Sequence, residues 1–521
     1  MEQDRMLQPP ASPCPPHIPS GDLARARANG AASEHESFWR VRDSASGATP
    51  DAASARLTWE SGEGRLDYLA TAGYVDVRDD TGRLQAKMFC LSYVSVDQGS
   101  CADRRRPVTF CYNGGPGCAS VPINFGGFGP LRVRPAGRDH LRFDAPVEDN
   151  PYTVLKYSDL VFLDAPGTGF SPLAEGQDSS SLFGIDGDAD AFCRAIAAWL
   201  ELNGRWDAPL YLLGESYGTL RNAVLMRLLG ERGIKLVGVI MLSAIWDWVQ
   251  TLPGEDLYYL GMLPTFAATA QYFNKAGIGR DADEFFDEAM DFTEHRYAPA
   301  LLLGDRLDKQ EECKMAQYMS RMIGLPESFI VQRHLRVSLE DFRARLLYEE
   351  GKVTGRLDTR FTSDAPGYQQ QSWEWFAGED AADDVVNAVW NRAFRSFIHQ
   401  DLGFKAPARY LDNNYHAVGE KWDWSHEAPG TGQKVGAPNV AIDIACALRR
   451  DPTIKLCVLG GRFDAATTYW NVVHDLSAQF LSSQIQERVE FHRYGCGHMA
   501  YVDEPSLAAI DKDLAAFYAK Q

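Results

Sequence analysis

The 521-residue sequence predicts an α/β fold with a mainly parallel central sheet that is flanked by helices. Apolar runs typical of buried strands alternate with segments of helical spacing between residues 159 and 242. The same alternation returns from residue 454 to the C-terminus. A Gly-x-Ser-x-Gly sequence at 214–218 separates an apolar run from a helix-compatible run, which is typical of a strand–turn–helix unit in such a sheet.

The N-terminal part of the chain is expected to lead into a set of hairpins. Residues 1–56 are rich in Pro, Ala, Ser and Gly, which predicts a disordered or extended tail with a short helix near 34–42. From 57 to 96, apolar and polar residues alternate around turn sequences, so we expect consecutive hairpins there. A strand over 107–112 follows.

The first part of the α/β core is expected over 57–249. Buried parallel strands are predicted where short apolar runs occur, at 159–164, 210–213 and 236–242. Helices are predicted where apolar residues recur every three to four positions, at 186–203 and 219–229.

A helical insertion is expected over 250–404, because this stretch shows helical patterns without strand–helix alternation. We expect it to form a cap over the catalytic edge of the sheet. The second part of the core should then occupy 405–521, with strands at 454–459 and 489–492 and a final helix at about 505–519.

Composition limits the class of protein. The formal net charge is −19, from 52 basic and 71 acidic residues, which argues against a nucleic-acid partner. No apolar run is long enough to span a membrane, so no membrane partner is expected. The ten cysteines form no Cys-x-x-Cys pair, and the sequence contains no His-Glu-x-x-His and no phosphate-binding loop. We therefore expect no metal and no cofactor, while disulfide pairing and oligomeric state stay open.

The N-terminus begins Met-Glu-Gln-Asp and continues into Pro-rich sequence, without the charged and apolar regions of a signal peptide. If the chain is complete as given, a cytoplasmic location is expected. If a leader has been removed, a secreted or periplasmic location is expected instead.

The Gly-Glu-Ser-Tyr-Gly sequence at 214–218 predicts a nucleophile elbow, with Ser216 on a tight turn above the sheet edge. A serine hydroxyl needs a base to remove its proton, and the base needs an acid that fixes its tautomer. Asp464 and His498 follow Ser216 in the chain, each just beyond a predicted strand, where open α/β sheets hold their ligands. Each of the two alone could be an ordinary loop residue, but together they predict a catalytic triad.

The Gly-rich sequence at 113–117 predicts a loop that approaches the substrate closely. Acyl transfer passes through an oxyanion, which needs backbone N–H donors. The N–H groups of Gly115 and of Tyr217, the residue after the nucleophile, are the expected donors. The alternative is a simple Asn-Gly turn.

Four motifs, in this order along the chain, resemble those of the serine carboxypeptidase family. They are Asn-Gly-Gly-Pro-Gly-Cys at 113–118, Phe-Leu-Asp-Ala-Pro at 162–166 with Gly-Phe-Ser at 169–171, Gly-Glu-Ser-Tyr-Gly at 214–218 and Gly-His-Met at 497–499. The resemblance covers about residue 70 to the C-terminus. It implies an α/β-hydrolase fold with a helical cap, and release of C-terminal residues from peptides at acid pH.

The resemblance also implies roles for single residues. Ser216, Asp464 and His498 would form the triad. Asn113, Gly114 and Glu215 would bind the terminal carboxylate of the substrate, and Met499 would line the leaving-group side; an alternative for Glu215 is a buried brace of the elbow. In well-studied members a second glutamate follows fourteen residues after the Asn, where this chain has Gly127. Because two acids that share a proton can hold a carboxylate, this departure puts the acid optimum and the need for a free C-terminus in question.

Several alternatives stay open at this stage. The leading interpretation is a serine hydrolase that acts through an acyl-enzyme on Ser216. An esterase or an acyltransferase would use the same acyl-enzyme, and a hydrolase scaffold can also carry a non-catalytic binding protein. Arg221 either serves the substrate or pairs with a core carboxylate. Cys118 and Cys496 are better explained as small buried residues than as reactive thiols. The expected partner is a peptide or another acyl substrate.

Overall fold

The computed structural model describes residues 52–96, 105–134, 145–252, 254–364, 380–406 and 408–520, without the side chains of 382–386. Most of the predicted N-terminal tail, including the helix expected near 34–42, lies outside this part of the chain. Where the description begins, the structure differs from the prediction, because Ala53 already starts a strand, β1 (Ala53–Ser61). Every residue of β1 pairs with β2 (Gly64–Arg78), a partner that composition alone does not reveal.

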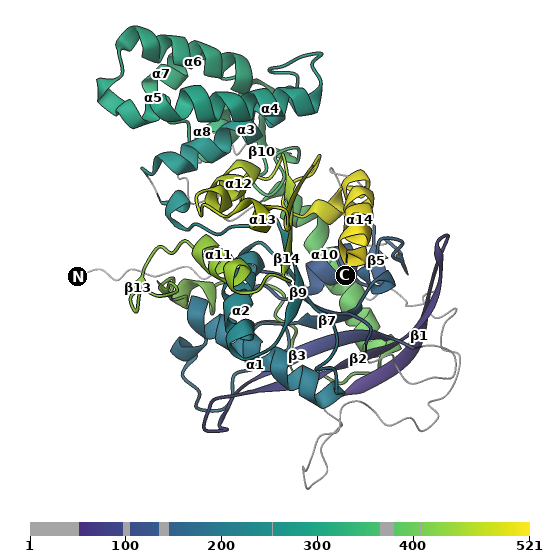
Figure 1. Cartoon of the computed structure of the whole chain (residues 1–521). Helices are drawn as coiled ribbons and strands as arrows, with labels where there is room; N and C mark the ends of the chain where they lie inside the picture. Colours follow the sequence, from purple (N-terminus) through teal and green to yellow (C-terminus); the bar gives the residue numbers. More distant parts are fainter. Residues whose placement is uncertain are drawn as a thin grey trace, which may run out of the picture.

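At the centre of the described part of the chain is a nine-stranded sheet with the order β1-β2-β3-β7-β4-β8-β9-β14-β15 (Figure 1). The bounds of the further strands are β3 (Leu84–Ser95), β4 (Val108–Tyr112), β7 (Asp159–Leu163), β8 (Leu210–Glu215), β9 (Leu236–Leu242), β14 (Lys455–Gly461) and β15 (Val489–Tyr494). The strands β1 to β3 form an antiparallel meander, and the other six run parallel to one another. The predicted hairpins and the mainly parallel sheet are confirmed.

Helices cover both faces of this sheet, so every residue of β4, β7 and β8 is buried. On one face lie α1 (Ile185–Asn203), α2 (Tyr217–Glu231) and α11 (Ala441–Arg450), whose apolar side chains share one core cluster. On the other face lie α10 (Ala381–Ser396) and α14 (Glu504–Ala519), which belong to a second cluster.

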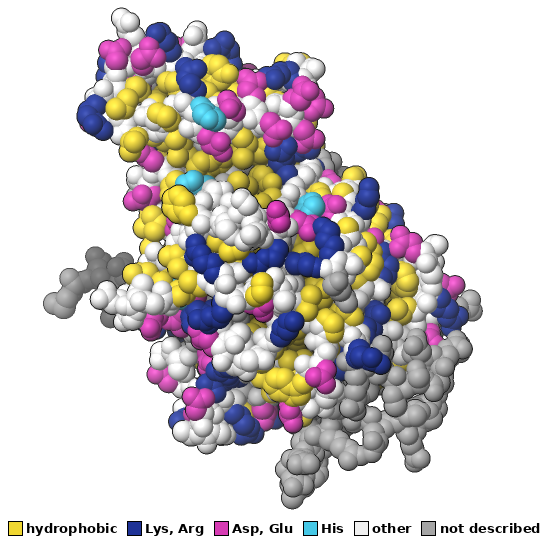
Figure 2. All heavy atoms as spheres, in the orientation of Figure 1, with side chains coloured by type: hydrophobic (Ala, Val, Ile, Leu, Met, Phe, Trp, Pro, Cys, Tyr) yellow, Lys and Arg dark blue, Asp and Glu magenta, His cyan; other side chains and the backbone are white. Residues whose placement is uncertain are grey.

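A helical lobe, which we define as α3 to α8, extends from one end of the sheet (Figures 1 and 2). Its helices are α3 (Asp256–Tyr272), α4 (Ala282–Phe292), α5 (Ala298–Leu303), α6 (Lys309–Ile323), α7 (Glu327–Gln332) and α8 (Leu339–Arg345). They enclose a core of their own, in which the rings of Phe266 and Phe342 stack with centroids 4.0 Å apart.

The stretch 250–404, expected from the sequence to be one helical cap, therefore contains two parts. The lobe is one part, while Trp390 and Phe394 of α10 pack into the core of the sheet itself. Between these parts lies a short hairpin of β10 (Lys352–Thr354) and β11 (Thr362–Asp364). The aromatic residues of α10 explain its position, because they fill the apolar face that the parallel strands present.

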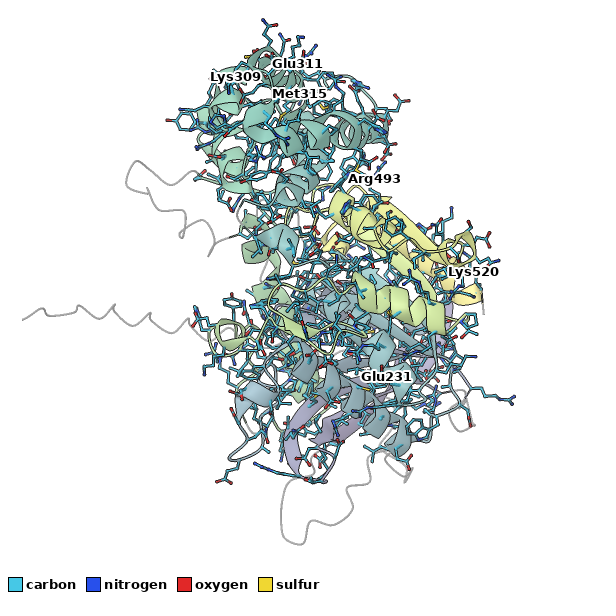
Figure 3. The ribbon with its side chains drawn as sticks, turned by 60° about the vertical axis from the view of Figure 1, so that its left-hand side comes forward. Glu231, Lys309, Glu311, Met315, Arg493 and Lys520 are labelled. Carbon is cyan, nitrogen blue, oxygen red and sulfur yellow. The ribbon has the colours of Figure 1, made fainter. Side chains whose placement is uncertain are left out.

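The lobe joins the body through close packing and ion pairs. Arg493, which Figure 3 shows at the junction, binds Asp287 of α4 at 2.6 Å and Asp283 at 3.3 Å. Gly261 of α3 lies so close to α12 (Tyr469–Ser477) that a Cβ there would come within 1.3 Å of Asn471 Oδ1. The lobe is thus held at a fixed position on the sheet.

The crossing segment, residues 408–440, runs across α1, α2 and α11 and carries β12 (His426–Glu427) and β13 (Lys434–Val435). Its His426 is fully buried, and both ring nitrogens donate to carboxylates: Nδ1 to Asp186 at 2.6 Å and Nε2 to Asp443 at 2.9 Å. The two negative charges outweigh the cost of burial and raise the pKa of His426 to about 9. A charged imidazole therefore fixes the segment to α1 and α11.

Besides several short 3-10 and π helices, such as η1 (Pro122–Phe128), three further short elements occur in the described part of the chain. They are β5 (Leu131–Val133), β6 (Val147–Asp149) and α13 (Ser483–Gln486). Within this part, none of the helices has both the length and the apolar character that crossing a membrane requires.

Candidate active site

Ser216 lies at the turn between β8 and α2, with φ of 58° and ψ of −129°. A residue with a side chain rarely adopts this backbone conformation, and such strain is concentrated at functional sites. The flanking glycines are needed for the turn, because a Cβ on Gly214 would lie 2.4 Å from the carbonyl oxygen of Gly218. The sequence thus folds locally into a strand–turn–helix elbow that presents Ser216.

Asp464 and His498 meet beyond the ends of β14 and β15. Nδ1 of His498 donates to Oδ2 of Asp464 at 2.8 Å. The other oxygen of Asp464 accepts the backbone N–H groups of Ala466 and Thr467, and Oδ2 also accepts the Thr467 hydroxyl at 2.8 Å. Because Asp464 is fully buried and held by several donors, it fixes the orientation of the imidazole.

The elbow and the histidine loop are linked through β9. The N–H of Ser216 donates to the carbonyl of Leu242, and the next residue, Ser243, donates its hydroxyl to the carbonyl of His498 at 2.6 Å. Among the described residues, the structure records no hydrogen bond between the hydroxyl of Ser216 and the imidazole. Such bonds are often long before substrate binds, so the geometry places the three groups in one region without completing the hydrogen-bond chain.

Electrostatics favour a charged imidazole. Burial acts to lower the pKa of His498, but the negative charge and the hydrogen bond of Asp464, with the nearby Glu215, outweigh it. The pKa of His498 therefore lies above its usual 6.5. Burial also raises the pKa of Glu215, to about 7, although the charge of His498 opposes this shift.

The glycine-rich loop at 113–117 lies directly against the elbow. A Cβ on Gly114 would lie 2.4 Å from the backbone nitrogen of Tyr217. Tyr217 is the first residue of α2, so its N–H has no acceptor within the helix. Gly115 has a φ of 109°, which a residue with a side chain would adopt only with strain. The two N–H groups predicted as oxyanion donors thus belong to segments that lie in contact.

Asn113 and Glu215 are in direct contact behind the elbow. Nδ2 of Asn113 donates to Oε2 of Glu215 at 2.7 Å, while Oδ1 accepts the N–H of Ile123. The hydroxyl of Tyr501 reaches both carboxylate oxygens of Glu215, at 2.9 and 3.1 Å. The ring of Tyr501 lies over Gly127, where a Cβ would come within 2.9 Å of it.

Arg221 is a core residue. It binds Asp188 through two nitrogens, at 2.6 and 3.2 Å, and donates to the carbonyl of Asn113 at 3.0 Å. Its guanidinium also lies 4.0 Å from the centre of the Phe192 ring. Of the two alternatives, the structure therefore supports pairing with a core carboxylate, and this pairing braces Asn113 from behind.

The motif at 162–171 supports the glycine-rich loop. Asp164 accepts the N–H of Ser120 at 2.8 Å, and Ser171 donates to the Asp164 carbonyl. Burial raises the pKa of Asp164 to about 6. This motif acts at a distance from the elbow serine, by fixing the segment that follows residue 118.

Two residues singled out in the sequence, Cys496 and Met499, are buried in the core. Cys496 is fully buried, and burial raises the pKa of its thiol well above the usual range, as expected for an inert small residue. Met499 follows His498 directly and is mostly buried in the same core cluster as Cys496. Its position after the histidine is compatible with a lining role at the site.

Some residues around the site were not predicted. Thr467 binds Asp464, three residues before it, whereas Ser243 and Tyr501 bind predicted residues that are distant in sequence. A further contact comes from the loop after β10, where the carbonyl of Leu357 accepts the N–H of His498 at 2.6 Å. Motif spacing carries no signal for such long-range contacts.

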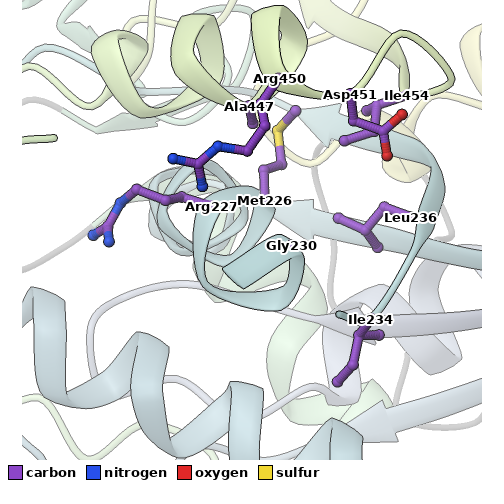
Figure 4. A pocket seen from close by; sticks show the side chains of 9 residues that line it. All are labelled: Met226, Arg227, Gly230, Ile234, Leu236, Ala447, Arg450, Asp451 and Ile454. Carbon is purple, nitrogen blue, oxygen red and sulfur yellow. The ribbon is translucent and has the colours of Figure 1, made fainter. Parts of the chain in front are cut away.

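A small pocket lies elsewhere, at the C-terminal end of α2 beside α11 (Figure 4). It is lined by Met226, Arg227, Gly230, Ile234, Leu236, Ala447, Arg450, Asp451 and Ile454. None of the predicted site residues lines it. In the described part of the chain, no group of three or more His, Cys, Asp or Glu side chains is arranged to hold a metal ion.

Comparison with known proteins finds similarity to the serine carboxypeptidase family. The sequence profile of the serine carboxypeptidase family matches residues 62–232. Serine carboxypeptidase-like 28 from Arabidopsis thaliana is 30% identical over 192 residues, which cover 35% of this chain and 38% of that protein. The pheromone-processing carboxypeptidase KEX1 of Phaeosphaeria nodorum is 34% identical over 118 residues, covering 22% of this chain and 16% of that protein. The chain thus covers well under half of the length of either relative.

The fold is also similar to a solved structure, that of KEX1(delta)p, a prohormone-processing carboxypeptidase from Saccharomyces cerevisiae. The TM-score is 0.56 at 13% identity, covering 87% of this chain and 91% of that chain. At this identity the likeness establishes the fold alone, and it extends over both halves of the molecule. Residues 62–232 thus resemble the serine carboxypeptidase family in sequence, and the chain has an α/β-hydrolase fold.

Proposed function

We propose that this protein is a serine carboxypeptidase that acts through an acyl-enzyme formed on Ser216. The observation that carries the proposal is the buried pair of His498 and Asp464, joined at 2.8 Å, beside a serine on a strained elbow. A base whose tautomer is fixed by a carboxylate is what a serine hydroxyl needs for activation.

In this mechanism the oxygen of Ser216 attacks the carbonyl carbon of the substrate while its proton passes to Nε2 of His498. The negative charge that develops on the carbonyl oxygen is met by the N–H groups of Gly115 and Tyr217, assisted by the N-terminus of α2. The protonated imidazole then donates to the leaving amine, which departs and leaves the acyl group on Ser216. Water, activated by the same base, releases the acyl group.

The substrate would be held by its C-terminal carboxylate. Asn113, Gly114 and Glu215 lie directly behind the elbow and present amide, backbone and carboxyl groups. Met499 would line the side that receives the leaving residue. This assignment makes the enzyme an exopeptidase, because a chain that continues past this point would meet buried side chains.

An esterase or an acyltransferase is the second candidate, and one observation favours it. The position where the family has a second acid is Gly127, and the ring of Tyr501 lies over it. A site without the acid pair has less to distinguish a free carboxylate from an ester or amide.

The first experiment labels the intact protein with a fluorophosphonate, which reacts with activated serines. Labelling is expected on the wild type and lost in Ser216→Ala, because only an activated hydroxyl forms the adduct. Ser180→Ala is the matched control, since Ser180 is exposed and bonded only locally to Asp178. No labelling of the wild type would refute the proposed hydrolase. Faster turnover of peptides with free than with amidated C-termini would then separate carboxypeptidase from esterase.

A further inference from the structure

Tyr501 fills the place that a second acid would need. A Cβ built on Gly127 would lie 2.9, 3.1 and 3.3 Å from three carbons of Tyr501. Tyr501 is fully buried, and its ring is also packed against Trp390, with centroids 5.4 Å apart. A glutamate at position 127 would therefore require this buried ring to shift.

The phenol of Tyr501 directs its hydroxyl at Glu215. It donates at 2.9 and 3.1 Å to the two oxygens of that carboxyl group, and Asn113 donates to one of them at 2.7 Å. Glu215 and Asn113 are themselves buried, with exposed fractions of 2% and 7%. The carboxyl group is therefore fixed by two neutral donors in a setting where water does not compete.

The charged groups around Glu215 are those of the proposed catalytic site. His498 and Asp464 act on it through their charges, from the loops that follow β15 and β14. Behind Asn113, the guanidinium of Arg221 is neutralised by Asp188. The charges of His498 and Asp464 thus act on the pKa of Glu215 in opposite directions, His498 lowering it and Asp464 raising it.

We propose that Tyr501 is a positioning residue that takes the place of the second acid, holding Glu215 so that its one carboxyl group binds the terminal carboxylate of a peptide as a neutral acid. This inference rests on the proposed carboxypeptidase function. Neutral Glu215 donates its O–H to the substrate carboxylate, while its own oxygens keep the hydrogen bonds from Tyr501 and Asn113. Ionised Glu215 repels the substrate carboxylate instead.

The direction of the pH dependence follows from this arrangement. Burial raises the pKa of Glu215 to about 7, and the hydrogen bond from Tyr501 opposes that rise by stabilising the ionised form. Removing the phenol hydroxyl therefore keeps Glu215 neutral to higher pH. Tyr501→Phe retains the ring over Gly127, so a residue that served packing alone would leave the pH profile unchanged.

The experiment measures binding rather than turnover. In a Ser216→Ala background of the full chain, calorimetry compares an N-acylated dipeptide that has a free C-terminal carboxylate with its C-terminal amide. We expect the preference for the free acid to fall on the order of tenfold per pH unit above about pH 7. In Tyr501→Phe the fall begins at higher pH, and in Glu215→Gln the preference no longer depends on pH in this range. His498 and Asp464 are the same in the parent and in Tyr501→Phe, so the comparison of these two profiles isolates the effect of the phenol hydroxyl.

Tyr518→Phe is the matched control. Tyr518 is also buried, and its phenol bonds to Thr109 at 2.7 Å rather than to Glu215, so the profile should stay that of the parent. A Tyr501→Phe profile that coincides with the parent profile overturns the proposal, and so does the absence of any preference for the free acid. Fluorophosphonate labelling of the Ser216-containing chain, measured in parallel, shows whether the hydrolase itself has failed or only this inference.

Discussion

At the scale of single residues, two strained backbone conformations lie just beyond the neighbouring strands β8 and β9. Ser216 and Ser243 both have positive φ, 58° and 51°, although neither is glycine. The second of these turns directs the hydroxyl of Ser243 onto the carbonyl of His498. Strain of this kind persists only where neighbours determine the conformation, and here those neighbours are the elbow and the histidine loop.

The charge of Asp464 is expected to set the basicity of His498. In Asp464→Asn the shape is kept but the charge is lost, so the pKa of His498 falls. We expect kcat to drop about 10³- to 10⁴-fold and the acid limb of the kcat/KM profile to move to lower pH, since the base then stays neutral at lower pH. Steady-state assays over a range of pH measure both kcat and the position of the acid limb.

Thr467→Val gives the graded control for that prediction. It removes one donor to Asp464 but leaves the charge in place, so a smaller loss with an almost unmoved acid limb is expected. Equal pH profiles for wild type and Asp464→Asn would contradict the assigned role of Asp464.

Local sequence was enough to predict the elbow, because its strand, its Gly-x-Ser-x-Gly turn and its helix are consecutive in the chain. It was also enough to find the residues that end strands, such as Asp464 and His498. The contact between Tyr501 and Gly127 could not be predicted, since the two positions are far apart in sequence and either could have faced another neighbour. The same holds for Leu357, whose carbonyl binds the N–H of His498.

At the scale of elements, apolar runs predicted the buried strands well, because helices cover both faces of the sheet and leave no polar face. Composition placed residues 53–56, the first four of β1, in the tail, whereas the strand from residue 57 onward was expected; pairing with β2 extends the strand to Ala53. The position of α10 also escaped prediction, since a helical pattern does not say which apolar surface its Trp390 and Phe394 will cover.

Because charged His426 joins Asp186 and Asp443, we expect the attachment of the crossing segment to weaken at alkaline pH. The pKa of His426 is raised from 6.5 to about 9. Its charged form therefore contributes fully to the stability of the folded protein below about pH 6.5, and this contribution is lost as pH rises through about 9. The contribution is on the order of 3 kcal/mol. Urea unfolding at about pH 6 and about pH 9.5 should show this loss for the wild type and much less of it for His426→Gln.

Lys434→Gln is the comparison for that measurement. Lys434 also approaches Asp186, at 3.3 Å, but it is half exposed, so its removal should change the free energy of unfolding little at either pH. A wild type whose stability is the same at both pH values would show that His426 does not carry the charge assigned to it.

At the scale of the whole molecule, a lobe and a body are joined, and the lobe cluster takes in Ala465 and Trp470 of the body. The lobe has its own apolar cluster, and the body has one cluster on each face of the sheet. The ion pairs of Arg493 involve partners that are largely exposed, Asp283 and Asp287, so they contribute modestly. Close packing between α3 and α12 is the stronger connection.

Gly261→Ala tests this connection. The new Cβ would overlap the Asn471 side chain, so either α3 shifts on α12 or Asn471 gives up its hydrogen bond to the Leu257 carbonyl. We expect a loss of about 1–3 kcal/mol or a separate unfolding step for the lobe. Gly230→Ala is the matched control, because this helical glycine in α2 has nothing within 4 Å of its Cβ position. It should stabilise the protein by about 0.5–1 kcal/mol. Calorimetric melting distinguishes the two, and equal melting of Gly261→Ala and wild type would refute the tight junction.

The hydrogen bond from the N–H of His498 to Leu357 has a consequence for protein engineering. The chain that returns from the lobe touches the loop of the proposed base, and a Cβ on Gly497 would overlap Asp358. A chimera that exchanges this insertion with that of a related hydrolase, to transplant its selectivity, would also replace the support of the imidazole. Grafts should therefore keep the native residues 355–361 and place their splice sites on the lobe side of them.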